Sequence, residues 1–291
     1  GAAHSIDEYG NAVHDTADAA GEATSSLDVM KGVLSGNFAT QALSAVVDKL
    51  REAASYAVKV GSDFEQGMST VEALSGAAGS ELDALKDKAA ELGRITIYSS
   101  TEVSEAMSYM ALAGWNTQQI LTSINDVLNL AKSSQMELGE ASDIVTDYIT
   151  AFGLSAKDAT HFVDVMAYAQ ANSNTTTAQL GEAYKNCAAT AGQFGYSVEE
   201  VTSALMTMSN SGLKSGEAGT SLNALMVRLA TNTKECATEL KKYGVSIYDS
   251  HGQMEDLTSI LTGTAAAMST LSDEEQANLA KIIAGQNQYT G

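Results

Sequence analysis

The feature that most constrains this sequence is a repeated signal for ending one helix and beginning the next. A glycine at the C′ position tolerates the left-handed conformation that ends a helix, and a Ser, Thr or Asn then caps the next helix, with an acid or amide three residues later. The full signal occurs at Gly114–Gln119, Gly153–Asp158 and Gly195–Glu200. Further caps occur at Ser80 with Asp83, Ser99 with Glu102, Thr176 with Gln179, and Ser272 with Glu275. Together these signals predict a chain of short helices.

Apolar residues between these signals repeat with the helical period. In 117–131 the stripe is Ile120, Leu121, Ile124, Val127, Leu128 and Ala131. The chain has no proline, the residue that costs a helix interior about 3 kcal/mol. We predict an all-α fold, a multi-helix bundle of short antiparallel helical hairpins. The helices are expected at 28–62, 65–75, 80–92, 100–113, 117–133, 140–152, 156–171, 177–193, 198–211, 217–243, 256–270 and 273–284.

Two short segments break the helical pattern. Residues 94–98 form a β-branched run, and residues 245–248 and 253–254 are typical of two extended arms around a turn at 249–252. We therefore expect at most one small β-ribbon.

The chain divides into two regions by pattern. Residues 1–61 comprise a polar segment and a long amphipathic helix, and residues 62–291 comprise the region of short helices. Within the second region the motif LGEA at 138–141 recurs at 180–183, and Phe152-Gly153 recurs as Phe194-Gly195. The offset of 42 residues is the size of a stacked helical hairpin, which predicts an internal repeat. Chance similarity between helices rich in Ala and Gly is the alternative.

The charge of the chain excludes several partners. With 16 Lys and Arg against 36 Asp and Glu, the formal net charge is −20, which argues against stable nucleic-acid binding and against attraction to anionic lipid. No apolar run reaches the roughly 18 residues of a membrane span, and no signal peptide is visible. The chain begins with Gly1 and not Met, so we expect a piece of a larger protein. The amphipathic helix at 28–60 is expected to pack on the rest of the chain, with self-association or membrane contact as alternatives.

The sequence contains no recognisable catalytic, cofactor-binding or metal site. Cys187 and Cys236 are expected to be buried free thiols, and a Cys187–His161 pair has nothing nearby to activate the thiol. The remaining histidines, His4, His14 and His251, show no metal-ligand spacing. Ser211–Lys214 matches an SxxK pattern without its companion motifs, and Asp249–Gly252 lacks the alternating acids of a calcium loop. We predict that the protein is not an enzyme and has no cofactor.

An ordered set of segments resembles the core region of phage tail tape-measure proteins, over roughly 62–291. The segments are DFEQGMSTVEALSGAAG at 63–79, ELG at 91–93 with EAM at 105–107, ALAGWNT at 111–117, SDIVTDYITAFGLS at 142–155, HFVDV at 161–165, SNSG at 209–212, AGTSL at 218–222 and LSDEEQ at 271–276. The first 60 residues match this core poorly.

The resemblance implies a structural role. A tape-measure protein is housed in the tail tube and sets tail length, so the resemblance implies location in the virion tail and, during assembly, in the bacterial cytoplasm. It implies tail-tube, baseplate or tail-tip proteins and tail chaperones as partners, and no catalytic residues in this region. The glycine stops indicate that 62–291 is a helical module and not the measuring rod. A membrane-active helical protein that aids envelope penetration is the alternative function.

Overall fold

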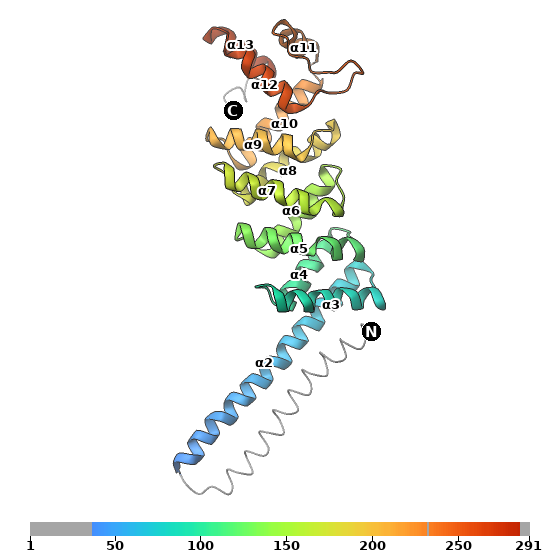
Figure 1. The fold of residues 1–291 in the computed structure, drawn as a ribbon, viewed down its shortest axis with the longest axis vertical. Coiled ribbons are helices and arrows are strands. Elements are labelled where there is room, and N and C mark those ends of the chain that lie inside the picture. The colour runs from blue at the N-terminus through green and yellow to red at the C-terminus, as the bar shows by residue number, and fades with distance from the viewer. Residues whose placement is uncertain (1–36, 232, 286–291) are drawn as a thin grey trace. The chain divides into compact units, whose positions relative to one another are not determined.

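The computed structural model of the chain describes residues 37–231 and 233–285 (Figure 1). The described residues contain helices and no strand, and one isolated antiparallel bridge joins Tyr248 to Met254. The prediction of an all-α fold built of short helices is therefore confirmed. The bridge lies between the two arms predicted around 249–252, where the amide N–H of Asp249 also donates to the carbonyl of Gln253 at 2.8 Å.

The chain packs as two compact units, the first ending at Leu121 and the second beginning at Thr122. In the first unit a long helix, α2 (Asn37–Ser75), packs on α4 (Ser100–Leu112) and on α3 (Ser80–Ile95). Their shared core includes Phe64, Met68, Val71, Leu85, Leu92, Met107 and Met110. Helix α5 (Thr117–Ser134) begins in this unit and continues into the second.

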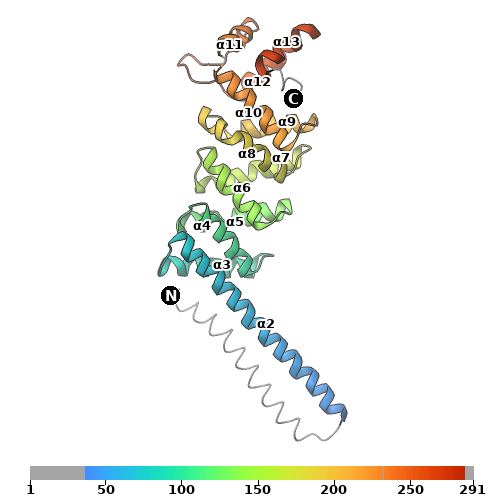
Figure 2. The same ribbon diagram turned by 180° about the vertical axis from the view of Figure 1, so that it is seen from behind.

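The second unit is a stack of helical hairpins. Helix α6 (Leu138–Ala151) pairs with α7 (Ala159–Asn172) through the short 3₁₀ helix η1 (Ala156–Asp158), and α8 (Thr177–Phe194) pairs with α9 (Val198–Asn210). Because α6 packs on α8 and α7 packs on α9, one hairpin lies directly on the next (Figures 1 and 2).

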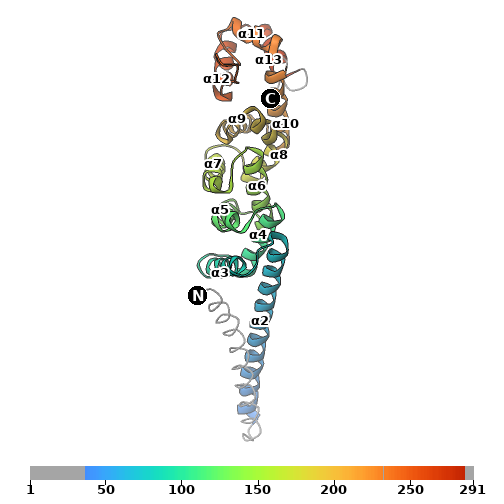
Figure 3. The same cartoon turned by 90° about the vertical axis from the view of Figure 1, so that its right-hand side faces the viewer.

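The last helices of the second unit extend these two rows. Helix α10 (Ser215–Thr231) packs on α8, and α12 (Leu257–Met268) packs on α9, as the turned view shows (Figure 3). Helices α11 (Thr233–Lys242) and α13 (Asp273–Ala284) both contact α10. The single helix predicted at 217–243 corresponds to α10 and α11, and residue 232 between them lies outside the described residues.

Helix α8 is the centre of the second unit. Tyr184 is fully buried, and its ring meets those of Tyr148 (centroids 5.5 Å apart), Phe152 (5.4 Å) and Phe162 (6.1 Å). On its other side α8 touches α10 so closely that a Cβ at Gly219 would lie 2.1 Å from the carbonyl oxygen of Ala183. Only a residue without a side chain fits this crossing.

The predicted helix stops are present. Gly114, Gly153 and Gly195 have φ of 86°, 72° and 81°, and the apolar residue after each donates its N–H to a carbonyl in the last turn. These are the bonds Trp115 N to Met110 O (3.1 Å), Leu154 N to Ile149 O (2.9 Å) and Tyr196 N to Ala191 O (2.9 Å). Gly212, inside the SxxK pattern, is another such stop, with φ of 98°.

Six of the seven predicted caps are present, and one prediction is wrong. Reciprocal bonds join the cap and the residue three positions later at Asn116, Ser155, Ser197, Ser99, Thr176 and Ser272. Ser80 is not a cap: α3 starts one residue earlier than that prediction requires, and its N-cap is Gly79, which has φ of 58° and no side chain to bond.

Two further predictions need correction. The helices predicted at 28–62 and 65–75 are continuous across 62–65, because Phe64, Met68 and Val71 lie on one buried face that a break would interrupt. Residues 28–36 lie outside the described residues. The β-branched run at 94–98 is not extended throughout: α3 runs to Ile95 and a bend follows, leaving Ile95 and Ile97 exposed. The division into 1–61 and 62–291, and the 42-residue repeat, stay predictions.

Candidate binding groove

The side chains with reactive potential are placed in the core or in turns. Cys187 is buried in α8, and burial raises the pKa of its thiol to about 12, so the reactive thiolate is suppressed. Cys236 is also buried, with its Sγ 3.4 Å from the carbonyl oxygen of Ile282. Both are free thiols, as predicted.

The histidines within the described residues bond to nearby acids. His161 meets the carboxylate of Glu199 on α9 at 2.5 Å. His251 lies in the turn at 249–252, where Asp249 accepts its backbone N–H at 2.8 Å. No group of three or more potential metal ligands occurs in residues 37–231 and 233–285, and His4 and His14 lie outside them.

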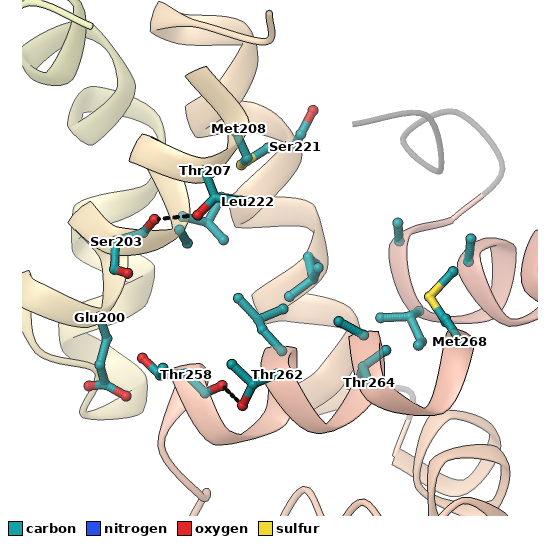
Figure 4. A pocket seen from close by; sticks show the side chains of 17 residues that line it. Glu200, Ser203, Thr207, Met208, Ser221, Leu222, Thr258, Thr262, Thr264 and Met268 are labelled. Carbon is teal, nitrogen blue, oxygen red and sulfur yellow. Dashed lines mark hydrogen bonds between the residues drawn. The ribbon is translucent and has the colours of Figure 1, made fainter. Parts of the chain in front are cut away.

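The second unit contains a groove of about 470 Å³ between four helices. Its lining comes from α9, α10, α12 and α13, and every helix contributes apolar side chains (Figure 4). The apolar lining residues are Ala204, Met208, Leu222, Leu225, Leu261, Ala265, Met268, Ala280, Ile283 and Ala284. Nothing in the sequence marked this groove, because its walls come from segments up to 84 positions apart that look like ordinary amphipathic helices.

Threonine hydroxyls in the groove are turned back to their own helices. Thr207 donates to the carbonyl of Ser203 at 3.0 Å, and Thr262 donates to the carbonyl of Thr258 at 2.7 Å (Figure 4). Thr264 donates to Ile260 in the same way at 2.6 Å. Because the hydrogen of each of these hydroxyls is already bonded, the three threonines have no free hydroxyl donor for a ligand in the groove.

Glu200 is the one charged residue among the seventeen that line the groove. One of its oxygens accepts the N–H of Ser197 at 2.7 Å, which caps α9, and the other accepts the N–H of Leu257 at 2.6 Å, at the start of α12. The carboxylate thus joins the first turns of two helices and stands at one end of the groove. An apolar groove with a few polar groups at its edge is a common form of ligand-binding site.

Comparison with known proteins places this chain among phage tail proteins. The family model described as phage-related minor tail protein matches residues 86–285, which include the whole groove. The tape measure protein of Pneumococcus phage Dp-1 is 34% identical over 248 residues, which are 85% of this chain and 22% of that protein. The probable tape measure protein of Escherichia phage P2 is 27% identical over 230 residues, 78% of this chain and 28% of that protein.

The chain therefore spans less than a third of the length of either relative. No solved structure matches the chain significantly.

Proposed function

This chain belongs to the family of phage-related minor tail proteins, and we propose its function on that basis. It is a segment of a tape measure protein, a structural and assembly protein that is housed in the tail tube and sets tail length. The identity of 34% across 85% of the chain with the Dp-1 tape measure protein is the observation that carries the proposal. A structural role needs no catalytic residue, and none is assigned.

Within that role the second unit is a helical module and not the measuring rod. A continuous helix rises about 1.5 Å per residue, so a rod converts residue number directly into tail length. The helices from α6 to α13 are 10 to 18 residues long and fold back on one another, so their residues do not add up along one axis.

Tail assembly by the phage or prophage that encodes the full-length protein tests the role. Deleting the gene should abolish tails or change their length in electron micrographs, and peptides from 62–285 should be found by mass spectrometry in purified tails or assembly intermediates. Tails of unchanged length without the gene would contradict the proposal.

A duplication tests the module separately. Repeating residues 138–210, the α6–α7 and α8–α9 hairpins, in the full-length protein should leave tail length unchanged, whereas a rod would lengthen the tail by about 110 Å. An insert of equal length within a coiled-coil region of that protein is the control that must lengthen the tail.

The partners follow from the same role. We propose contacts with tail-tube and baseplate or tail-tip proteins and with tail chaperones, first in the bacterial cytoplasm during assembly and then in the virion tail. Self-association through 28–60 is a further proposal. The net charge of −20 would let DNA pass without adhering, and retention of DNA by the purified chain near ~0.15 M salt would count against that idea.

A second candidate function is that of a membrane-active protein. No helix among the described residues combines the length and the apolar character that crossing a membrane requires. The membrane-active alternative rests on the helix at 28–60, part of which lies outside the described residues, and it stays a prediction.

A further inference from the structure

We propose that the groove between α9, α10, α12 and α13 binds an amphipathic helix of a partner protein that carries basic residues beside its apolar stripe. The proposal states which kind of partner the groove binds, and it holds whether or not the protein sets tail length. All the residues that line the groove come from this one chain.

The shape of the groove favours a helix over a compact ligand. Along α12 the lining residues are Thr258, Leu261, Thr262, Thr264, Ala265 and Met268, and all but Thr264 follow the i, i+3, i+4, i+7 spacing of one helical face. These positions extend over about 15 Å of helix, or roughly three turns. Figure 4 shows Glu200 beside Thr258 at one end and Met268 at the other. A partner helix presents apolar anchors at the same spacing over the same length, which is how helices dock in grooves.

The charge at one end favours a basic partner. The carboxylate of Glu200, a residue of α9, lies beside the first turn of α12, because it accepts the N–H of Leu257. Glu255 and Asp256 directly precede α12 in the sequence. Asp256 caps α12 by accepting the N–H of Ser259 at 2.7 Å. Three carboxylates outweigh the roughly half positive charge of the helix N-terminus, so this end is negative. A lysine or arginine flanking the apolar anchors would be complementary to it.

The stacking pattern leaves this site open. Helices α7 and α9 are packed against each other, and α12 then covers α9. The cover is incomplete, because Ser203 and Thr207 of α9 and Thr258, Thr262 and Ala265 of α12 remain exposed although they line the groove. A further helix would complete the layer.

Fluorescence anisotropy with two synthetic peptides tests the inference on the purified 1–291 chain. The probe is a fluorescein-labelled amphipathic peptide of about 18 residues, or five turns, with Leu on one face and Lys elsewhere. Its twin has Glu in place of every Lys. The basic peptide should bind at least about tenfold tighter than the acidic twin at ~0.15 M salt, a difference of about 1.4 kcal/mol. No binding by the basic peptide, or equal binding by the twin, would overturn the proposal.

A matched pair of variants separates the groove from general attraction to an acidic protein. Ala265 and Ala266 are neighbouring exposed residues of α12, and only Ala265 lines the groove. Ala265→Trp fills the groove and should weaken the basic peptide at least about tenfold, whereas Ala266→Trp should change its affinity less than about twofold. Circular dichroism melts should be alike for both variants. Equal affinities in the pair would place binding elsewhere and refute the proposal.

Two other occupants give different results. If Ala265→Trp lowers self-association of the chain in sedimentation equilibrium, the groove binds a second copy. If it abolishes binding to phosphatidylcholine vesicles, the groove takes lipid. Either result would overturn the proposal of a basic helix.

Discussion

Glycines lie both inside helices and at helix ends in each unit, and comparing the interior glycines of α2 with the stops of the second unit shows what separates the two positions. Helix α2 is 39 residues long and passes through Gly61 and Gly67 without a break, whereas helices of the second unit end at Gly153, Gly195 and Gly212. The next residue is one part of the difference, and tertiary packing is the other. Ser62 follows Gly61, whereas Leu154, Tyr196 and Leu213 follow the terminating glycines. Gly67 is followed by the apolar Met68, which stays helical on the buried face it shares with Phe64 and Val71.

At the stops of the second unit, the apolar residue after glycine stabilises the end of the helix. It folds back on the last turn and donates its N–H to a carbonyl there, as Tyr196 does to Ala191. The end of α2 also has a left-handed glycine, Gly76 with φ of 70°, and a buried Ala77 after it, but the N–H of Ala77 donates to the Ser75 hydroxyl at 3.2 Å. A glycine followed by a polar residue lacks this contact and is compatible with a continuing helix.

Removing the apolar residue at a stop should have the largest effect. Tyr196 is 3% exposed, and Tyr196→Ala should lower the free energy of unfolding by about 3 kcal/mol in urea titrations, because a large buried ring is lost. Tyr168, an exposed tyrosine of α7, is the control, and Tyr168→Ala should stay within about 0.5 kcal/mol of the parent. Similar losses for both would mean that the ring at the stop does not stabilise the second unit.

Close contact between helices should be the next most sensitive feature. Gly219→Ala brings a Cβ to 2.1 Å from the Ala183 oxygen, so a backbone must move, and we expect a loss of about 2 to 3 kcal/mol. Gly216→Ala on the same helix meets the flexible Asn186 amide at 3.2 Å and the Glu182 oxygen at an ordinary contact distance of 3.9 Å, and should stay within about 0.5 kcal/mol. Thermal and urea unfolding followed by circular dichroism compares them, and a tolerated Gly219→Ala would show that α8 and α10 can separate.

The left-handed backbone at a stop should have a smaller cost of its own. A Cβ at Gly195 would meet nothing within 4 Å, so Gly195→Ala should cost only the backbone conformation, about 1 to 2 kcal/mol. Gly195→Asn should lose less, because Asn tolerates this conformation better. The urea midpoints of the two variants should rank in that order, and the reverse order would contradict the role of φ.

The caps should give the smallest effect, and they separate a correct from an incorrect prediction. Ser99 accepts the N–H of Glu102 at 3.2 Å, so Ser99→Ala should cost about 1 kcal/mol. Ser80 caps nothing, so Ser80→Ala should be neutral or slightly stabilising in the same urea titration. Equal losses would show that Ser80 stabilises α3 by some other contact.

Local signals predicted most helix ends because a cap or stop involves residues within six positions of each other. Where they failed, a longer-range contact decided the outcome, as with the buried face of Phe64, Met68 and Val71 that keeps α2 continuous. The end of α5 is a helix stop that the glycine signal does not detect. Gln135 takes a left-handed φ of 54° without being glycine, and Met136 then donates to Ala131 at 3.1 Å.

The groove could not be predicted in the same way. Ala265 and Leu222 belong to ordinary amphipathic stripes, and nothing in either segment shows that their helices leave a space between them. The pairing of Glu200 with Leu257 is equally invisible, because the capping motif accounts for Glu200 by its contact with Ser197 alone.

The sequence by itself determined that this protein is a series of capped, glycine-terminated helices with an acidic surface, because caps, stops and charge depend on neighbouring residues and on composition. Tertiary structure decided which helices lie together. The absence of a side chain at Gly219 admits α10 to the backbone of α8, and the partial cover of α9 by α12 opens the groove. Both features depend on how the surfaces of helices that are distant in the sequence pack together. That packing depends on the volumes of side chains in three dimensions, which cannot be read from the order of residues.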